Sequence, residues 1–200
     1  MQNAPDDLLS QFELVRTQAR WLGCKWDLFS ELFWRYPKRQ QLYLQSDDLM
    51  YCFRFIFEAL HDDILMGLCR LGDPAKAHGQ ENLTFQRLLD HPAWRKKGRL
   101  DRRLRTLQKL LDDTRKHRHK RVGHSDLAVS LGQQALPKIG KSLPKAVKSA
   151  LALSDAIEQE LERTDATPRR SLGRDAACAL LRQLCIAARC EKKALHEAAR

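Results

Sequence analysis

The sequence predicts an all-α protein, an up-and-down bundle of about five to six helices. Nine Gly and seven Pro in 200 residues are too few for an architecture built from many strands and turns, whereas Leu, Ala, Arg and Lys abound. Apolar residues recur at steps of three and four along several segments, which is the helical period. No segment predicts a strand. The length suits one core, so we expect residues 1–200 to form a single helical domain.

Two long helices are predicted in the first third of the chain. The first covers residues 6–35, where apolar residues recur at helical spacing, and Pro37 lies just beyond its end. The second starts after Ser46, covers residues 47–71 and ends at Gly72. This second helix is apolar nearly all round, which predicts a place in the middle of the bundle.

The remaining elements are shorter or more polar. They are a short helix opened by Asn82 (83–90), a basic helix stopped by Gly123 (99–122), a looser segment (125–142), and two C-terminal helices (143–163 and 173–199) joined by a hinge (164–171). We expect the functional motifs to lie within residues 47–126 and the C-terminal helices within residues 143–199.

Neither a leader nor a membrane span is predicted. Residues 1–7 lack the basic and apolar regions of a signal peptide. The longest stretch without an ionisable side chain, residues 127–137, contains a glycine, two glutamines and a proline, and is too short and too polar for a bilayer span. We therefore expect a cytoplasmic protein.

The six cysteines fit a reducing compartment. They are Cys24, Cys52, Cys69, Cys178, Cys185 and Cys190. No Cys-x-x-Cys motif occurs, so neither a zinc site nor a redox pair is predicted. A metal site formed by Cys185 and Cys190 with His196 is the alternative, but helical spacing puts those side chains on different faces. We expect buried, reduced thiols and no bound metal or other cofactor.

Positive charge is concentrated in residues 95–121. This segment holds thirteen Lys and Arg against three Asp, while the whole chain has a net charge of +11. So dense a block indicates either a solvated helix face or a surface that binds a polyanion. Because the rest of the chain is close to neutral, we favour the polyanion.

Arg118 lies on the apolar face of the predicted basic helix. That face steps by three and four through Leu100, Leu104, Leu107 and Leu111, and continues through Thr114, Arg118 and Val122. A charged group that points toward a packed surface is either paired or functional. The sequence leaves both interpretations open: an ion pair with Glu58 or Asp62 of the second long helix, or a functional arginine.

A histidine follows immediately after the predicted stop of this helix. Arg118, the polar His119 and His124 form an Arg–polar–x4–His pattern beside a helix terminus, within a basic surround. Two further Arg–His pairs have comparable spacing, but a phenylalanine or a cysteine follows each arginine, and both lie within helices at ordinary same-face spacing. These pairs are Arg54 with His61 and Arg189 with His196.

The pattern is similar to the Arg–polar–x(4–6)–His motif of the HEPN superfamily. A broader set of strings resembles the abortive-infection U-like branch of that superfamily, in the same order and with similar spacing. The strings are Cys69-Arg-Leu-Gly-Asp-Pro-Ala-Lys, Glu81-Asn-Leu-Thr-Phe, Leu88-Leu and Arg118-His-Lys-Arg-Val-Gly-His-Ser-Asp126, with a weaker echo at Gly173-Arg-Asp-Ala and Leu180-Leu. One departure is His119, which is polar but stands where Asn or Asp is commoner.

The resemblance implies an all-helical, dimeric, metal-independent endoribonuclease. Arg118 and His124 are the implied catalytic residues, supported by His119, Lys120, Arg121 and Asp126. RNA carries its own nucleophile in the 2′-OH, imidazole transfers protons near neutrality, and guanidinium stabilises charge on a phosphorane. The sequence offers no carboxylate cluster for Mg²⁺. Two copies would bring four such groups to one scissile phosphate.

Upstream of the motif, the basic side chains are candidates for RNA-backbone contacts. They are Lys96, Lys97, Arg102, Arg103, Arg105 and Lys109. The leading hypothesis is a homodimeric ribonuclease toxin of phage defence, with an antitoxin protein as a further expected partner. The alternatives are a catalytically silent helical module that binds nucleic acid, and a structural or protein-binding bundle in which Arg118 is ion-paired.

Overall fold

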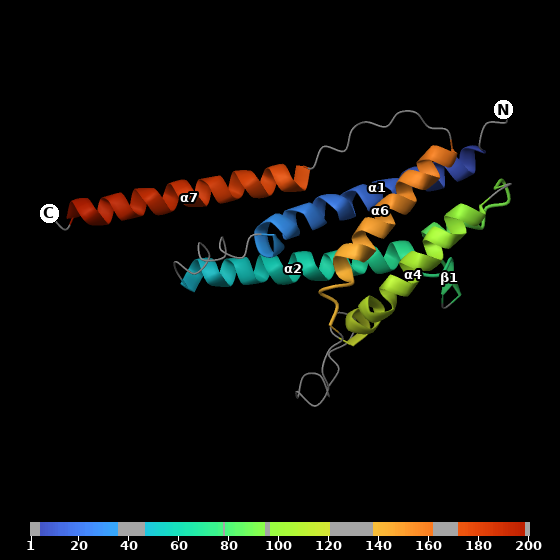
Figure 1. Cartoon of the computed structure of the whole chain (residues 1–200), viewed down its shortest axis with the longest axis horizontal. Coiled ribbons are helices and arrows are strands. Elements are labelled where there is room, and N and C mark those ends of the chain that lie inside the picture. Colours follow the sequence, from blue (N-terminus) through green and yellow to red (C-terminus); the bar gives the residue numbers. More distant parts are fainter. Residues whose placement is uncertain are drawn as a thin grey trace. The chain divides into compact units, whose positions relative to one another are not determined.

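The fold was analysed in a computed structural model, which describes residues 5–35, 47–77, 79–94, 97–120, 138–161 and 172–198, with side chains of the last segment to residue 187. These residues contain six α-helices, a π-helical turn η1 and two strands (Figure 1). The elements are α1 (Asp6–Phe29), η1 (Ser30–Trp34), α2 (Asp47–Gly72), β1 (Lys76–Ala77), β2 (Gln80–Glu81), α3 (Phe85–Leu89), α4 (Gly98–Arg118), α6 (Leu143–Glu160) and α7 (Leu172–Ala198).

The predicted all-α class is confirmed. α1 with η1 and α2 follow the bounds predicted from periodicity, α4 starts within one residue of its predicted start, and α6 and α7 match the two C-terminal helices. The predicted stops at Pro37 and Gly123, the loop at 125–137 and the hinge at 164–171 lie outside the described residues.

The hairpin β1–β2 was not predicted. Its two antiparallel pairs are Lys76 with Glu81 and Ala77 with Gln80. Gly79 in the turn has a φ of 77°, a left-handed conformation that costs glycine nothing. Two residues per strand are too few to show an alternating pattern, so the sequence carries no strand signal here.

The short helix α3 begins later than predicted. Thr84, not Asn82, is its N-cap: the Thr84 hydroxyl accepts a hydrogen bond from the backbone N–H of Arg87 at 3.1 Å. Asn82 instead donates from its side chain to the carbonyl of Pro74 at 3.1 Å, and its backbone N–H donates to the carbonyl of Ala75 at 2.8 Å. Asn82 therefore fixes the turn after α2.

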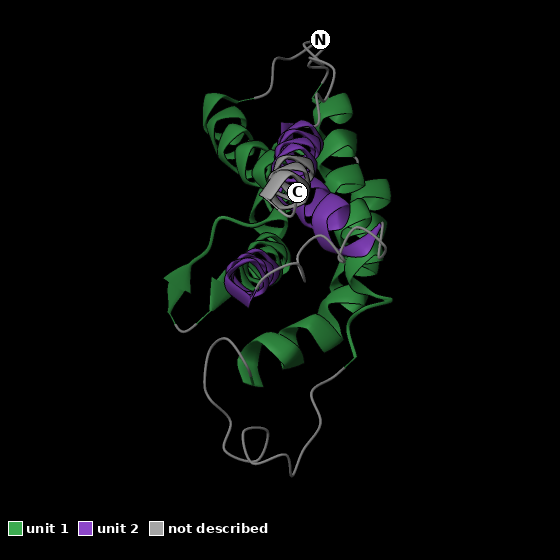
Figure 2. Ribbon diagram, turned by 90° about the vertical axis from the view of Figure 1, so that its left-hand side faces the viewer, with its two compact units in different colours: residues 1–23, 62–168 green, residues 24–61, 169–200 purple. Residues whose placement is uncertain are grey.

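The described residues group into two compact units, here named unit 1 (residues 1–23 and 62–168) and unit 2 (residues 24–61 and 169–200) (Figure 2). In unit 1, α6 lies against α4, and α3 also contacts α4 (Figure 1). The core of unit 1 is built from large buried side chains. They include Phe12, Val15, Ile64, Leu65, Leu68, Phe85, Leu88, Leu104, Leu107, Leu111, Val147 and Leu153.

Gly72, at the end of α2, permits a close approach to α4. A Cβ built on Gly72 would lie 2.3 Å from Cδ1 of Leu111, which is fully buried. No side chain larger than hydrogen fits there without displacing Leu111. This glycine therefore sets how closely the end of α2 packs on the basic helix.

Unit 2 has its own apolar core. Its buried members are Leu32, Phe53, Ala177 and Leu181, so η1, α2 and α7 all contribute. The aromatic rings of Phe29, Phe33 and Phe57 lie within 5.5 Å of one another, and His61 stacks on Phe57 at 5.7 Å. Gly173 in α7 allows backbone contact, because a Cβ there would lie 1.8 Å from the carbonyl oxygen of Cys24.

The N-terminal half of α2 is more exposed than its composition predicts. Met50, Tyr51 and Phe55 are exposed, Phe55 to 69%, whereas the C-terminal half from Ile64 to Leu71 contributes five fully buried apolar side chains. Cys52 is likewise exposed, and only Cys69 among the described cysteines is buried. The predictions of an all-round buried helix and of uniformly buried thiols are therefore wrong for this half of α2.

Candidate functional site

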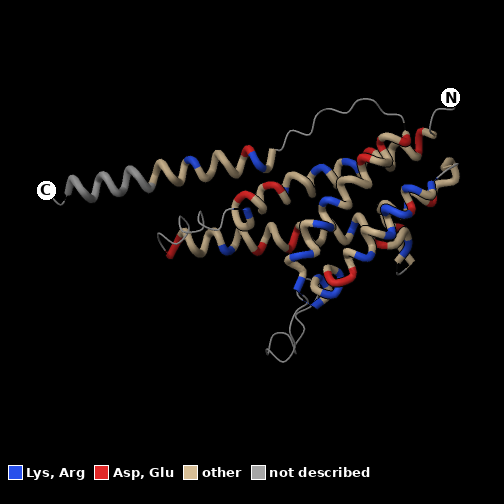
Figure 3. Tube along the Cα trace, in the orientation of Figure 1, with Lys and Arg blue, Asp and Glu red and all other residues tan. Residues whose placement is uncertain are grey.

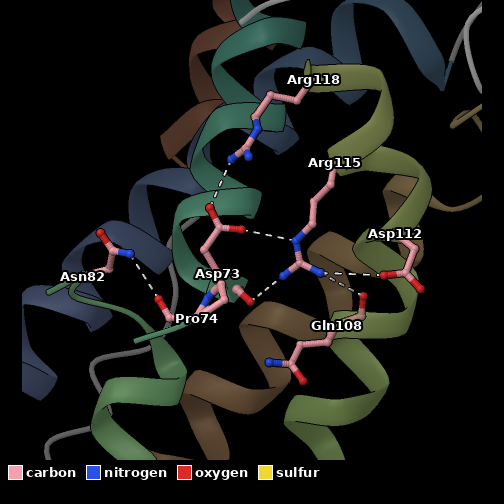
Figure 4. Close-up of polar contacts among 8 residues, drawn as sticks. Asp73, Pro74, Asn82, Gln108, Asp112, Arg115 and Arg118 are labelled. Atoms are coloured by element: carbon pink, nitrogen blue, oxygen red, sulfur yellow. Dashed lines mark hydrogen bonds and ion pairs between the residues drawn. The ribbon is translucent and has the colours of Figure 1, made fainter. Parts of the chain in front are cut away.

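Arg118, the last residue of α4, is held by an acidic residue that follows α2. Its Nη1 donates to Oδ2 of Asp73 at 3.1 Å, and the two side chains are 27% and 23% exposed (Figure 4). The predicted pairing with an acidic residue is confirmed, but the predicted partners Glu58 and Asp62 are wrong. α2 ends at Gly72, so at the level of Arg118 the basic helix faces the turn rather than the helix.

Asp73 also binds Arg115, one turn earlier on α4. Nε of Arg115 donates to Oδ1 of Asp73 at 3.2 Å, and its Nη2 donates to the carbonyl of Gly72 at 2.6 Å (Figure 4). Arg115 further donates to the carbonyl of Gln108 at 3.4 Å and lies 3.7 Å from a carboxylate oxygen of Asp112. Arg115 therefore has several partners, all of which stabilise the fold. Arg118 has one partner among the described residues, which is Asp73.

The buried stripe of α4 departs from the predicted one at its end. Leu100, Leu104, Leu107, Leu111 and Thr114 are buried as expected, and His117 is buried in place of Arg118. Arg118 is long enough to reach past the packed surface to Asp73 and to remain in contact with water. Positive side chains in this last turn also interact favourably with the helix dipole.

Cys69 lies in the same neighbourhood, one turn before the end of α2. It is fully buried, and burial raises the pKa of its thiol to about 11, against the opposing effect of the Arg118 charge. The thiol is therefore protonated near neutral pH and packs as a small apolar group.

Arg118 and Asp73 line a pocket of about 470 Å³. The hairpin β1–β2 and the turn before it supply the other lining residues, which are Pro74, Ala77, Gln80 and Asn82. The pocket thus joins three of the strings that carry the family resemblance: the turn after α2, the Glu81-Asn string and the end of the basic helix. The end of the basic helix is far from the other two strings in the sequence, and all three meet around Arg118.

The predicted RNA-binding side chains differ in how exposed they are and in whether they already bind another residue. Arg102, Arg105 and Lys109 are exposed on α4, and Arg103 is half-buried. Lys97 is engaged instead: its Nζ donates to the carbonyl of Leu89 at 2.6 Å and lies 3.9 Å from Asp90. Of the predicted supporting residues, His119 is exposed and Lys120 half-buried, while Arg121 and Asp126 lie outside the described residues. The predicted catalytic residue His124 and the predicted RNA contact Lys96 also lie outside them.

Sequence reasoning missed a second row of positive charge, on α6. Lys138, Lys141, Lys145 and Lys148 are all exposed. Lys145 and Lys148, three residues apart, lie on one side of α6, and Lys138 and Lys141 lie in the segment just before it. α6 contacts α4, and Figure 3 shows blue segments along both. The spacing itself is visible in the sequence, but which side of α6 is exposed becomes known only from its packing.

The described residues contain neither a group of metal ligands nor a helix suited to span a membrane. Within the described ranges no three His, Cys, Asp or Glu side chains are grouped so as to hold a metal ion. No helix in the described part of the chain combines the length and the apolar character of a membrane span.

Comparison with known proteins supports the resemblance seen in the motifs. The family model HEPN_AbiU2, described as AbiU2, matches residues 5–165 of the 200. Searches among curated proteins and among solved structures found no match. The matched region contains α1 to α6, the pocket and the whole Arg–polar–x4–His motif. The chain therefore belongs to the HEPN_AbiU2 family, the abortive-infection branch of the HEPN superfamily.

Proposed function

We propose that this protein is a metal-independent endoribonuclease that acts as a toxin in phage defence. The observation that carries the proposal is Arg118: the first residue of the HEPN motif lines a solvent-accessible pocket at the end of a strongly basic helix. A guanidinium in that place suits a phosphodiester, because it offers a planar fork of N–H donors to phosphate oxygens.

The proposed reaction uses the nucleophile that RNA carries. The 2′-OH attacks the adjacent phosphorus, the bond to the 5′-oxygen of the next nucleotide breaks, and a 2′,3′-cyclic phosphate remains. Arg118 stabilises the negative charge on the phosphorane oxygens. His124 transfers a proton, either from the 2′-OH or to the leaving 5′-oxygen. Asp73 supports Arg118 through the ion pair of 3.1 Å, which limits the directions that the guanidinium takes.

The backbone of a bound RNA is proposed to follow the positive surfaces of unit 1. The exposed side chains of α4 are one such surface, and the α6 lysine row is the other. Arg103 and Lys97 belong to the same proposed surface, Lys97 more weakly because the Leu89 carbonyl already holds its ammonium group. Lys96, outside the described residues, stays a predicted RNA contact. Each phosphate contact releases counterions, which supplies affinity without reading sequence.

A homodimer is part of the proposal. One Arg118 and one His124 are few groups for two proton transfers and charge stabilisation, and a second copy at the same phosphate doubles them. The toxin role further implies an antitoxin, a separate protein that blocks RNA access or catalysis. Light scattering across protein concentration tests the dimer, and a monomer at high micromolar concentration contradicts the shared site.

The direct test is RNA cleavage in EDTA. Wild-type protein is expected to cleave mixed RNA and to leave cyclic phosphate ends, whereas His124→Ala is expected to lose a factor of about 100 or more. His91→Ala is the matched control, because its imidazole bonds to Asp7 at 2.9 Å and does not line the pocket. Activity that EDTA abolishes and Mg²⁺ restores overturns the mechanism.

A second candidate is a catalytically silent module that binds RNA or a protein. The ion pair of Arg118 with Asp73 favours it, since an arginine with a carboxylate partner has a structural role without any substrate. If neither the wild type nor His124→Ala cleaves RNA, this candidate replaces the enzyme, whereas equal cleavage by both overturns the role of His124 in proton transfer. Affinity for RNA that falls with salt then separates an RNA-binding module from a protein-binding one.

A further inference from the structure

The hairpin β1–β2 presents its two faces to different surroundings. Cross-strand partners share a face and successive residues alternate, so Ala77, Gln80 and Asn82 lie on one side. All three line the pocket. On the other side, Lys76 lies 3.4 Å from Glu81, and Glu81 also binds Arg87 at 2.9 Å. The ion pairs hold the hairpin from outside and leave its amide-bearing face to the pocket.

Asn82 is held in a fixed orientation within this wall. Its side-chain nitrogen donates to the carbonyl of Pro74 (Figure 4). Its backbone N–H donates to the carbonyl of Ala75. With the nitrogen engaged, Oδ1 is an acceptor to which no described residue donates. Gln80, its neighbour on the same face, is exposed and offers both a donor and an acceptor.

The remaining wall combines apolar surface with an ion pair. Pro74 and Ala77 are apolar, Arg118 supplies the positive charge, and Asp73 supplies the carboxylate that holds Arg118 at 3.1 Å. A flat apolar ring with polar edges, attached to a phosphate, matches this set of groups. The volume of about 470 Å³ lies within the usual range for small-ligand pockets.

We propose that this pocket is a nucleobase subsite next to the phosphate bound by Arg118, and that it selects adenine and cytosine over uracil. The proposal rests on the proposed function, because it uses Arg118 as the phosphate-binding group. Oδ1 of Asn82 accepts a hydrogen bond from the amino group of adenine or cytosine, and the Gln80 amide pairs with the adjoining edge. Uracil presents a carbonyl oxygen where these bases present the amine, and two acceptors then face each other.

Binding of uncleavable RNA tests the subsite without any catalysis. The probes are homotrimers of A, C and U in which every 2′-OH is methylated, so that no internal attack occurs. The A and C trimers are expected to bind the wild type about threefold to tenfold more tightly than the U trimer, the discrimination of about one hydrogen bond. Asn82→Ala is expected to bring that ratio close to one, and Gln80→Ala to lower it.

Two comparisons keep the test independent of folding. Gln80 is exposed, so Gln80→Ala leaves the fold intact even if Asn82→Ala disturbs the turn. Gln86→Ala removes an amide that bonds to Asp90 outside the pocket, and it is expected to keep the full wild-type ratio. A wild-type ratio near one, or an unchanged ratio in folded Asn82→Ala and Gln80→Ala, overturns the subsite.

The outcome also separates the subsite from the nuclease. Selective binding of the trimers by a protein that cleaves no natural RNA overturns the proposed enzyme and supports the subsite. Cleavage of natural RNA without selective trimer binding overturns the subsite alone.

Discussion

Asp73 and Arg118, 45 residues apart in the chain, form a hydrogen-bonded ion pair at 3.1 Å across the end of α2 and the end of α4. The same carboxylate binds Arg115, so one negative charge holds two guanidinium groups. Since Arg118 carries the proposed chemistry, Asp73 is its positioning residue.

Asp73→Asn is expected to weaken both the fold and the proposed catalysis. An amide leaves Arg115 and Arg118 close together without a counter-charge, which lowers the free energy of unfolding by roughly 1–3 kcal/mol. Misplacement of Arg118 is expected to slow RNA cleavage by about tenfold to a hundredfold at saturating RNA. Urea unfolding and cleavage rates measure the two effects.

Asp90→Asn is the matched control for that variant. Asp90 pairs with Lys97 at 3.9 Å on an exposed surface, so its loss is expected to change the free energy of unfolding by less than ~1 kcal/mol. Equal effects of the two substitutions contradict a special role for Asp73.

Gly72→Ala is expected to destabilise unit 1. The new Cβ would lie 2.3 Å from Cδ1 of the buried Leu111, and such overpacking costs about 1–3 kcal/mol. Gly98→Ala tests the same change of residue in open space, because nothing lies within 4 Å of a Cβ there. Thermal unfolding is expected to show a lower midpoint for the first variant and an equal or higher midpoint for the second, which lies in a helix.

Neutralising one exposed cation of unit 1 is expected to change RNA affinity through its salt dependence. Arg105→Gln, Lys109→Gln and Lys145→Gln should each reduce the slope of log affinity against log salt by roughly 0.7 for a single strand. None should abolish cleavage at saturating RNA. Arg54→Gln serves as the control, because its guanidinium is exposed and already pairs with Glu58 at 3.3 Å. If Arg54→Gln lowers the slope as much, RNA binding depends on the total positive charge of the protein, and the proposed surface of α4 and α6 is contradicted.

The hairpin beside the pocket is expected to loosen in acid. The hydrogen bond from Arg87, with Lys76 as a second partner, lowers the pKa of Glu81 below its ordinary value of 4.5. A lowered pKa in the folded state contributes stability that is complete above pH 4.5 and is lost as the pH falls through the lowered value. The chemical shift of the Gly79 amide is the measurement, and it should move with pH below 4.5 in the wild type but not in Glu81→Gln.

The helices were predictable because their signals are local. Apolar spacing and the stop at Gly72 lie within the elements they define, so α1 and α2 follow from sequence alone. The hairpin shows no period, because each strand has two residues. Thr84 and Asn82 are both good caps, and only the fold decides that Thr84 caps α3 while Asn82 binds the preceding turn.

The candidate site was predictable only in part, for a different reason. The family motif identifies Arg118, and the stripe of leucines predicts that it meets a covered surface. The partner of Arg118 could not be predicted from the sequence, because Asp73 lies in the string Gly-Asp-Pro, which is also explained as an ordinary helix stop. A pairing that joins two helix ends depends on where both helices terminate in space, and residue spacing along one helix holds no information about the other.

The charge of α4 couples folding to whatever occupies its surface. This helix carries eight Lys and Arg against three Asp, and its other side is buried in the core of unit 1. Folding therefore brings these like charges close together on the exposed side of one helix, where they repel one another. Any anion that binds there relieves the repulsion and shifts the folding equilibrium toward the native state. Bound RNA is then expected to stabilise the folded state of the protein that is proposed to cleave it. Salt has two opposite effects, because it weakens RNA binding but stabilises the free protein by screening the repulsion between these charges.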